Sequence, residues 1–255
     1  MGVTTLDMRV AVVTGGSGGI GHAVGVRLAE TGHHVVSVDR SAPSPEQVAR
    51  LGRGLSYETR LLDLADDAGL AEFVRSIASR FGRLDVLVNN AGIHPKNADG
   101  SRQSIDDIRI EDWRGTFAVN VTAAFLLAQG ALALMRERRW GRVINISSRA
   151  GRTLVDTAGA HYAASKSAII GFTRVLAKEA GPHGITANCL APGWIDSPLT
   201  AQIPEQARVK AASAIPVGFA GQPFDIAAAV EFLASDGSRY INGAVIDVNG
   251  GSFMG

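Results

Sequence analysis

Tyr162 and Lys166 are the residues of this sequence whose types and spacing most clearly could do chemistry. They lie four positions apart, at the start of a stretch with apolar residues at helical spacing that continues to about residue 179. A helix there would place the phenol and the ammonium on one face. A nearby cation favours phenolate and lowers a pKa that is ordinarily about 10. Such a tyrosine could exchange a proton with a substrate, although the same spacing also occurs in purely structural helices.

A glycine-rich turn near the N-terminus predicts a nucleotide site. Residues 9–14 form a short β-branched run suited to a buried strand, and a helical pattern follows the turn through Leu28. Glycines let the backbone turn tightly and approach a pyrophosphate, which then rests at the positive end of the helix. The residues of this turn expected to contact a cofactor are Gly15, Ser17, Gly18, Gly19, Ile20 and Gly21.

The second predicted strand, residues 34–38, ends at Asp39. This lies about 20 residues beyond the glycine turn, where an acidic side chain can accept a hydrogen bond from an adenosine ribose hydroxyl. A carboxylate there repels a 2′-phosphate, whereas the adjacent Arg40 could pair with one. The glycine turn itself contains no Lys or Arg. We therefore expect NAD as the cofactor in preference to NADP; the alternative for Asp39 is a solvated charge at a strand end.

Further strands are expected at residues 57–62, 84–88, 142–146, 185–190 and 244–248, with helices at 66–80, 107–138, 162–179 and 224–234. This alternation predicts an α/β fold: one Rossmann-type domain over residues 1–255, with a doubly wound parallel sheet of about seven strands flanked by helices. Ligands on such sheets bind at the carboxyl ends of the strands. Asp63, Leu64 and the segment Asn89-Asn90-Ala91-Gly92 fall at such ends.

Composition excludes several classes of protein. Lys plus Arg number 25 and Asp plus Glu 24, so the net charge of +1 indicates no nucleic-acid partner. The single Cys189 excludes an internal disulfide, and no metal-site pattern is present. The sequence shows no signal-peptide pattern, and we expect no apolar run long enough to span a bilayer. A cytoplasmic protein without membrane contact is the expectation.

Together these residues resemble the short-chain dehydrogenase/reductase family over residues 9–251. The glycine turn resembles the family's coenzyme loop, and the Asn-Asn-Ala-Gly segment resembles its sheet-stabilising motif. The resemblance implies further cofactor contacts from Asn90, Ala91, Gly92, Tyr162, Lys166, Pro192, Gly193, Ile195 and Ser197, which stands where the family usually has Thr. It also implies a catalytic tetrad of Asn120, Ser148, Tyr162 and Lys166 and a homotetrameric assembly.

The implied reaction passes a hydride between a nicotinamide cofactor and a secondary alcohol or ketone. Tyr162 would exchange the proton, and Lys166 would lower the pKa of Tyr162 and hold the nicotinamide ribose. Ser148 would donate a hydrogen bond to the substrate oxygen. Asn120 would hold a water that links Lys166 to bulk solvent. Ser147 competes with Ser148 for its role; the strand-end position favours Ser148, although its spacing to Tyr162 is one residue longer than is commonest in the family.

The substrate is less well defined by the sequence. His94, Arg149, Arg152 and His161 could all lie at the pocket mouth, and their convergence would favour an anionic or polyhydroxylated substrate. Trp194 would either form a wall of the pocket or pack beneath residues 196–217, which we expect to be a lid.

Two other functions compete with an NAD-linked alcohol dehydrogenase or ketone reductase. A 3-oxoacyl-thioester (acyl-carrier-protein) reductase of the fatty-acid type is resembled in length and in residues 241–243 and 249–251, but it usually prefers NADPH, which Asp39 disfavours. The remoter alternative is a non-catalytic nucleotide-binding sensor or scaffold. Such proteins tend to lose the Tyr or the Lys, and this chain retains all four tetrad positions.

Overall fold

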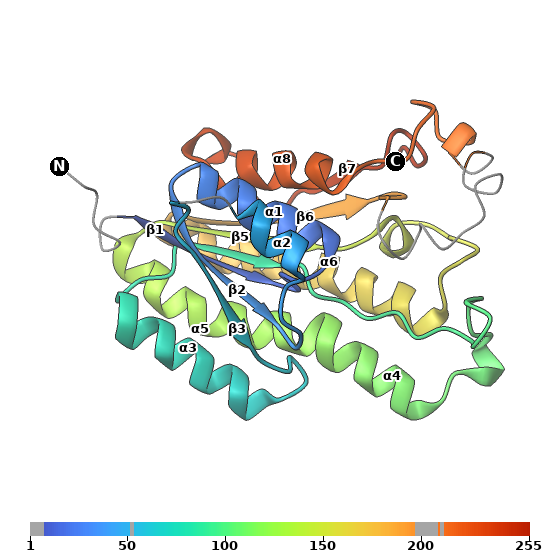
Figure 1. The fold of residues 1–255 in the computed structure, drawn as a ribbon, viewed down its shortest axis with the longest axis horizontal. Coiled ribbons are helices and arrows are strands. Elements are labelled where there is room, and N and C mark those ends of the chain that lie inside the picture. Colours follow the sequence, from blue (N-terminus) through green and yellow to red (C-terminus); the bar gives the residue numbers. More distant parts are fainter. Residues whose placement is uncertain (1–7, 52–53, 197–208, 210–211) are drawn as a thin grey trace.

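A seven-stranded parallel sheet runs through the computed structural model, which describes residues 8–51, 54–196, 209 and 212–255 (Figure 1). The strand order is β3-β2-β1-β4-β5-β6-β7, so the chain winds outward in both directions from β1 and β4. The doubly wound parallel sheet expected from the sequence is confirmed. The strands are β1 (Arg9–Thr14), β2 (His33–Asp39), β3 (Tyr57–Leu61), β4 (Val86–Asn89), β5 (Gly141–Ile146), β6 (Ile185–Pro192) and β7 (Val245–Val248).

Helices cover both faces of the sheet, because alternate strand residues point to opposite sides. Val10 and Val12 of β1 belong to the core beneath α3 (Asp67–Phe81), α5 (Ala123–Arg138) and α6 (Ala160–Ala180). Ala11 and Val13 belong to the core beneath α1 (Gly19–Glu30) and α8 (Pro223–Ala234) on the other face. Figure 1 shows these two helical layers above and below the sheet.

The helix expected over residues 107–138 is interrupted in the structure. A 3₁₀ turn (Ile105–Asp107) precedes α4 (Ile110–Phe117), and a π-helical turn, η2 (Ala118–Thr122), then separates α4 from α5. The prediction of one uniform helix over residues 107–138 was therefore wrong. Apolar periodicity does not reveal the one-residue widening of a π turn, which is frequently found at functional sites. Asn120 lies in the middle of this turn and is buried.

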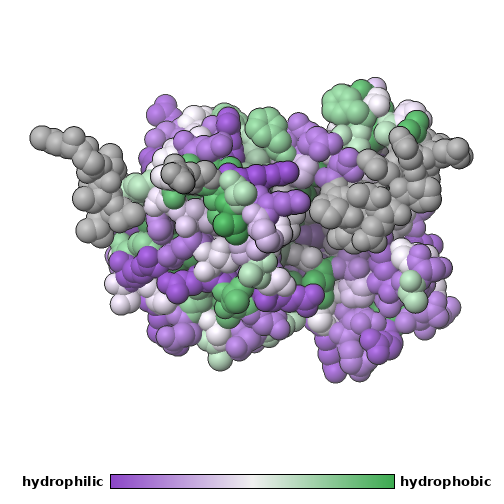
Figure 2. All heavy atoms as spheres, in the orientation of Figure 1, coloured by the Kyte–Doolittle hydropathy of each residue, from purple (hydrophilic) through white to green (hydrophobic). Residues whose placement is uncertain are grey.

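The helical stretch Ile110–Arg138 is long and apolar enough to cross a membrane by length and composition alone. The expectation that no such run exists was therefore wrong. However, Leu127, Ala128 and Ala131 of this stretch pack into the core against the sheet, so it is a core helix of the fold. Figure 2 shows hydrophilic residues over most of the visible face, with apolar side chains scattered among them.

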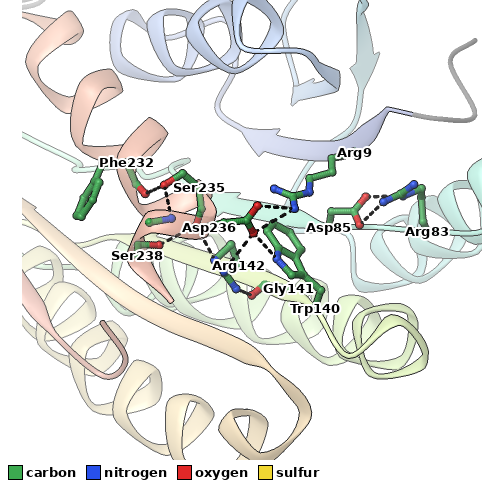
Figure 3. Close-up of polar contacts among 11 residues, drawn as sticks. Arg9, Arg83, Asp85, Trp140, Gly141, Arg142, Phe232, Ser235, Asp236 and Ser238 are labelled. Atoms are coloured by element: carbon green, nitrogen blue, oxygen red, sulfur yellow. Dashed lines mark hydrogen bonds and ion pairs between the residues drawn. The ribbon is translucent and has the colours of Figure 1, made fainter. Parts of the chain in front are cut away.

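A cluster of charged and aromatic side chains lies at the amino-terminal edge of the sheet, opposite the carboxyl ends of the strands (Figure 3). Asp236, just after α8, accepts hydrogen bonds from Arg9 at 3.0 Å and from Nε1 of Trp140 at 2.9 Å. The guanidinium groups of Arg9 and Arg142 lie over the Trp140 ring, 3.9 and 4.4 Å from its centroid. This cluster connects the start of β1, the start of β5 and the end of α8.

Candidate active site

The glycine turn after β1 has the geometry expected of a phosphate site. Gly15 has a φ of +69°, a conformation that favours glycine, and a Cβ on Gly21 would collide with the Gly15 carbonyl oxygen. Helix α1 begins at Gly19 with no side-chain cap among the described residues and no acidic residue in its first turn. Its first N–H groups are therefore available to an anion such as a pyrophosphate.

Asp39, at the end of β2, lies directly beside this turn. Its carboxylate accepts hydrogen bonds from the backbone N–H groups of Ser17 at 3.0 Å and Ser41 at 3.2 Å. Gln47, in the short helix α2 (Pro45–Arg50), donates from Nε2 to the Ser17 carbonyl at 2.9 Å. The adjacent Arg40 is exposed. Ser41 and Gln47 were not identified from the sequence, because nothing in the chain's local pattern shows that they meet the glycine turn.

The end of β4 and the segment after it form hydrogen bonds with the neighbouring strands β1 and β5. Thr14 of β1 accepts at Oγ1 from the backbone N–H groups of Asn90 at 3.0 Å and Ala91 at 3.1 Å. The Asn90 side chain donates to the Thr14 carbonyl at 2.9 Å, and Asn89 donates to Oδ1 of Asn145 in β5 at 2.8 Å. This segment therefore stabilises the sheet, as its resemblance to the family motif implied. At the next strand end, Asp63 accepts from the backbone N–H of Ala65 at 2.9 Å, and Leu64 is buried.

Tyr162 and Lys166 both lie in α6, as the spacing predicted. The ammonium of Lys166 is 5.7 Å from the centroid of the Tyr162 ring and donates to the Ile146 carbonyl at 2.9 Å. Burial raises the pKa of Tyr162 above its ordinary value, and a hydrogen bond with Ser148 opposes this rise. Desolvation is therefore the larger effect on the pKa of Tyr162 in this structure, and a lowering of that pKa by Lys166 stays a prediction. Burial also lowers the pKa of Lys166 to about 8.

The two adjacent serines at the end of β5 have different surroundings. Ser147 is buried and donates from Oγ to the Lys166 carbonyl at 2.7 Å, so its hydroxyl is bound within the fold. Ser148 is the residue that interacts with the Tyr162 phenol. Its Oγ also accepts from the backbone N–H of Ala150 at 3.1 Å, at the start of the 3₁₀ turn η3 (Arg149–Gly151). The geometry favours Ser148 over Ser147 as the group that faces a reacting oxygen.

Asn120 connects the π turn to the segment after β4. Its Oδ1 accepts from the Ile93 N–H at 2.8 Å, and its Nδ2 donates to the Ile93 carbonyl at 3.0 Å and to Oγ of Ser165 at 3.0 Å. Both amide protons are therefore used, and one acceptor position on Oδ1 is left for a water. Asn120 thus holds Ile93 and the start of α6 together.

His94 and His161 converge on Tyr162. The His94 ring lies parallel to the Tyr162 ring, with 4.3 Å between centroids and 16° between planes. The His161 ring is 5.8 Å from that of His94, is fully buried and contacts the Pro95 carbonyl at 3.2 Å through Nε2. Of the four residues proposed for the pocket mouth, these two are the ones that the structure brings together at Tyr162.

The two arginines of that set turn toward the C-terminal segment instead. Arg149 donates to the Ser252 carbonyl at 3.4 Å. Arg152 donates to the Gly255 carbonyl at 2.7 Å and pairs with Asp247 at 3.2 Å. The contact of Arg149 with substrate stays a prediction, and in this structure its guanidinium binds the Ser252 carbonyl.

The segment after β6 lies at the carboxyl edge of the sheet, next to the end of β5. The N–H of Gly193 donates to the Val248 carbonyl at 3.0 Å, which continues the pairing of β6 with β7 beyond Pro192. Ile195 forms a parallel bridge with Gly221. Trp194 lines a cavity of about 430 Å³ with Val209, Phe219 and neighbouring residues, so it packs beside the segment before α8. Ser197 and most of the expected lid, residues 196–217, lie outside the described residues.

Comparisons with known proteins agree with this geometry. A family model described as "Enoyl-(Acyl carrier protein) reductase" matches residues 15–252. The 3-oxoacyl-[acyl-carrier-protein] reductase FabG of Pseudomonas aeruginosa is 36% identical over 98% of this chain and 99% of its own length. Levodione reductase has a similar structure, with a TM-score of 0.86 and 32% identity over 95% of this chain and 96% of its own. A proposed NAD(P)-dependent gluconate 5-dehydrogenase from Beutenbergia cavernae, whose structure contains NADP at low occupancy, has a TM-score of 0.86 and 35% identity, covering 96% of each chain.

Proposed function

Because this chain belongs to the short-chain dehydrogenase/reductase family, we propose that it transfers a hydride between NAD, in preference to NADP, and a secondary alcohol or ketone. It is an NAD(P)-dependent oxidoreductase that acts on CH–OH groups. The preference for NAD, the roles of individual residues and the substrate class are our proposals.

The position of the Asp39 carboxylate carries the preference for NAD. It lies at the end of β2, bound to the backbone of the glycine turn, where an adenosine ribose would be held by hydrogen bonds to its hydroxyls. A 2′-phosphate placed there would meet a negative charge. The exposed Arg40 is the group that would oppose this preference, because a guanidinium can pair with a 2′-phosphate. The structure of the Beutenbergia cavernae protein contains NADP, so the affinities for NADH and NADPH must both be measured.

The nicotinamide ring of the cofactor would accept or donate the hydride. The glycine turn and the uncapped start of α1 would hold the pyrophosphate of the cofactor, because the first N–H groups of α1 are available to an anion. Tyr162 would pass a proton between its phenol oxygen and the substrate oxygen, and Ser148 would keep that oxygen in place by a hydrogen bond. Lys166 would provide positive charge beside them, and Asn120 would keep Ile93 and Ser165 in register.

The experiment is a measurement of NADH and NADPH binding, by nucleotide fluorescence, with the wild type and with Asp39→Ala. We expect the wild type to bind NADH more tightly than NADPH. Asp39→Ala should weaken NADH binding about tenfold, because two hydrogen bonds to ribose are lost, and should improve NADPH binding. Glu137→Ala, an exposed acid at the end of α5, is the matched control and should change neither.

A tighter affinity of the wild type for NADPH would contradict the proposed preference. Tyr162→Phe, tested in parallel, should bind NADH as the wild type does and lose turnover by about 100-fold or more, since the proton-exchanging group is absent. Turnover that persists in Tyr162→Phe would remove Tyr162 from the mechanism while leaving the cofactor result intact.

The name of the Pseudomonas aeruginosa relative supports a second candidate function, reduction of 3-oxoacyl-[acyl-carrier-protein]. It predicts NADPH preference and activity on 3-oxoacyl thioesters, which the same binding measurement and one thioester assay would reveal. Asp39 argues against it.

We propose a homotetramer as the assembly. Phe125 of α5 and Val175 of α6 are 45% and 57% exposed, on helices that present small residues for close packing. Light scattering of the purified protein would test this. The cytoplasmic location stays a prediction from the sequence.

A further inference from the structure

The His94 ring has one nitrogen whose hydrogen-bonding role is fixed by the fold. The backbone N–H of Gly159 donates to Nε2 of His94 at 3.3 Å. A backbone N–H can only donate, so Nε2 must be the unprotonated nitrogen of a neutral ring. Burial, Lys96 and His161 lower the pKa of His94 to about 4, so the ring is neutral at pH 7. The proton of the ring therefore lies on Nδ1.

Nδ1 of His94 has no hydrogen-bond partner within residues 8–51, 54–196, 209 and 212–255. It is a donor on a ring that lies face to face with the Tyr162 ring at 4.3 Å. The two rings are close enough that one bound molecule could contact both of them.

The ring is also held firmly. His161 is fully buried, and since the Pro95 carbonyl can only accept, Nε2 of His161 donates to it. Asn120 binds both backbone groups of Ile93. The residues on either side of His94 are thus fixed to α6 and to the π turn, and Gly159 fixes the ring itself.

The two arginines expected at the pocket mouth form hydrogen bonds with the C-terminal segment. Arg149 and Arg152 donate to carbonyl oxygens of the C-terminal segment. His94 is therefore the polar side chain, among the described candidates for the pocket mouth, that combines contact with Tyr162 and an unused donor.

We infer that His94 is a specificity-determining residue, which donates from Nδ1 to a second oxygen on the carbon next to the reacting one. The preferred substrates are then vicinal diols and the corresponding α-hydroxyketones. This inference rests on the proposed alcohol dehydrogenase function, and it names the substrate class of the same site.

Three alcohols test the inference with the wild-type enzyme and NAD. 2-Butanol has one oxygen, 2,3-butanediol has a second hydroxyl, and 3-methoxy-2-butanol has a second oxygen that accepts but cannot donate. We expect kcat/KM for both two-oxygen compounds to exceed that for 2-butanol by about tenfold or more, as one hydrogen bond to a buried donor contributes. The methoxy compound should keep the preference, because His94 donates and the substrate accepts.

Variants at position 94 extend the test. His94→Phe keeps an aromatic ring against Tyr162 and removes the donor, so the ratio of kcat/KM for 2,3-butanediol to that for 2-butanol should fall about tenfold. His94→Gln retains an N–H donor, so this ratio should fall less. His183→Phe, on the turn η4 (Gly181–His183) at the opposite edge of the sheet, is the matched control and should keep the wild-type preference.

The outcomes distinguish the role of His94 from the proposed function. Equal kcat/KM of the wild type for 2-butanol and 2,3-butanediol would overturn the role of His94 and leave the proposed function standing. Loss of preference with the methoxy compound would overturn the direction of the hydrogen bond. Oxidation of none of the three alcohols, with NADH binding intact, would overturn the proposed substrate class and leave the cofactor preference standing.

Discussion

Lys166 donates from Nζ to the Ile146 carbonyl at 2.9 Å, in a place where only 4% of the residue is exposed. Desolvation is the main reason that its pKa falls from 10.5 to about 8. The fold therefore tolerates a buried ammonium without a carboxylate partner among the described residues. A residue kept at this cost is typical of a functional site, where stability and activity compete.

Lys166→Met should make the protein more stable at pH 7. The lowered pKa corresponds to about 3 kcal/mol of destabilisation by the charged lysine, whereas the unpaired Ile146 carbonyl costs about 1 kcal/mol. We expect a net gain of about 2 kcal/mol in the free energy of unfolding, measured by urea denaturation, together with loss of turnover.

The gain of Lys166→Met should depend on pH. Below about pH 8 the lysine is charged in both the folded and unfolded states, so its full destabilisation is present. Between about pH 8 and 10.5 the folded state releases the proton before the unfolded state does, so the wild type recovers stability and the advantage of the variant shrinks. Lys178→Met, an exposed lysine of the same helix, should show neither effect. A constant advantage from pH 7 to pH 10 would contradict the lowered pKa.

Ser147→Ala and Ser148→Ala should separate structure from catalysis. Ser147→Ala removes a buried hydrogen bond to the Lys166 carbonyl and should lower the free energy of unfolding by about 1–2 kcal/mol. Ser148→Ala should change stability little and reduce kcat about 100-fold, because the hydrogen bond to the reacting oxygen is lost. Urea denaturation and steady-state kinetics on both variants check this. The reverse pattern would assign the role to Ser147.

Asp236→Ala should lower stability without loss of activity. It removes the acceptor shared by Arg9 and Trp140 and the carboxylate nearest to the buried Arg142, at the edge of the sheet away from the candidate site (Figure 3). Thermal and urea unfolding should show a loss of about 1–2 kcal/mol. Glu72→Ala removes an exposed pair with Arg75 and should cost less than about 0.5 kcal/mol. Equal effects of the two variants would mean that the Asp236 cluster contributes no more than a surface ion pair.

Several features of the fold could be predicted because they depend on short stretches of sequence. The β-branched run before Gly15 and the apolar periodicity after it predicted β1 and α1, and the alternation of such units predicted the parallel sheet. The spacing of Tyr162 and Lys166 placed both on α6, because a helix repeats every 3.6 residues. The position of Asp39 at a strand end placed it beside the glycine turn.

Features that depend on contacts between distant segments could not be predicted in this way. The side chain of Asn120, in the π turn, binds Ile93 and Ser165, which are distant in the sequence. The hydrogen bond of Arg149 to the Ser252 carbonyl joins residues that are far apart in the sequence. The pairing of His94 with Tyr162 requires that the segment after β4 lie across the start of α6.

The sequence by itself determined the order of strands and helices, the residue types at the carboxyl ends of the strands and the placement of Tyr162 and Lys166 on one helix. Only the tertiary structure decided that burial raises the pKa of Tyr162, that Ser148 and not Ser147 faces the phenol, and that His94 keeps a free donor. The physical reason is that periodicity is a local property of the chain, whereas desolvation and hydrogen-bond partners are set by every segment that packs around a group.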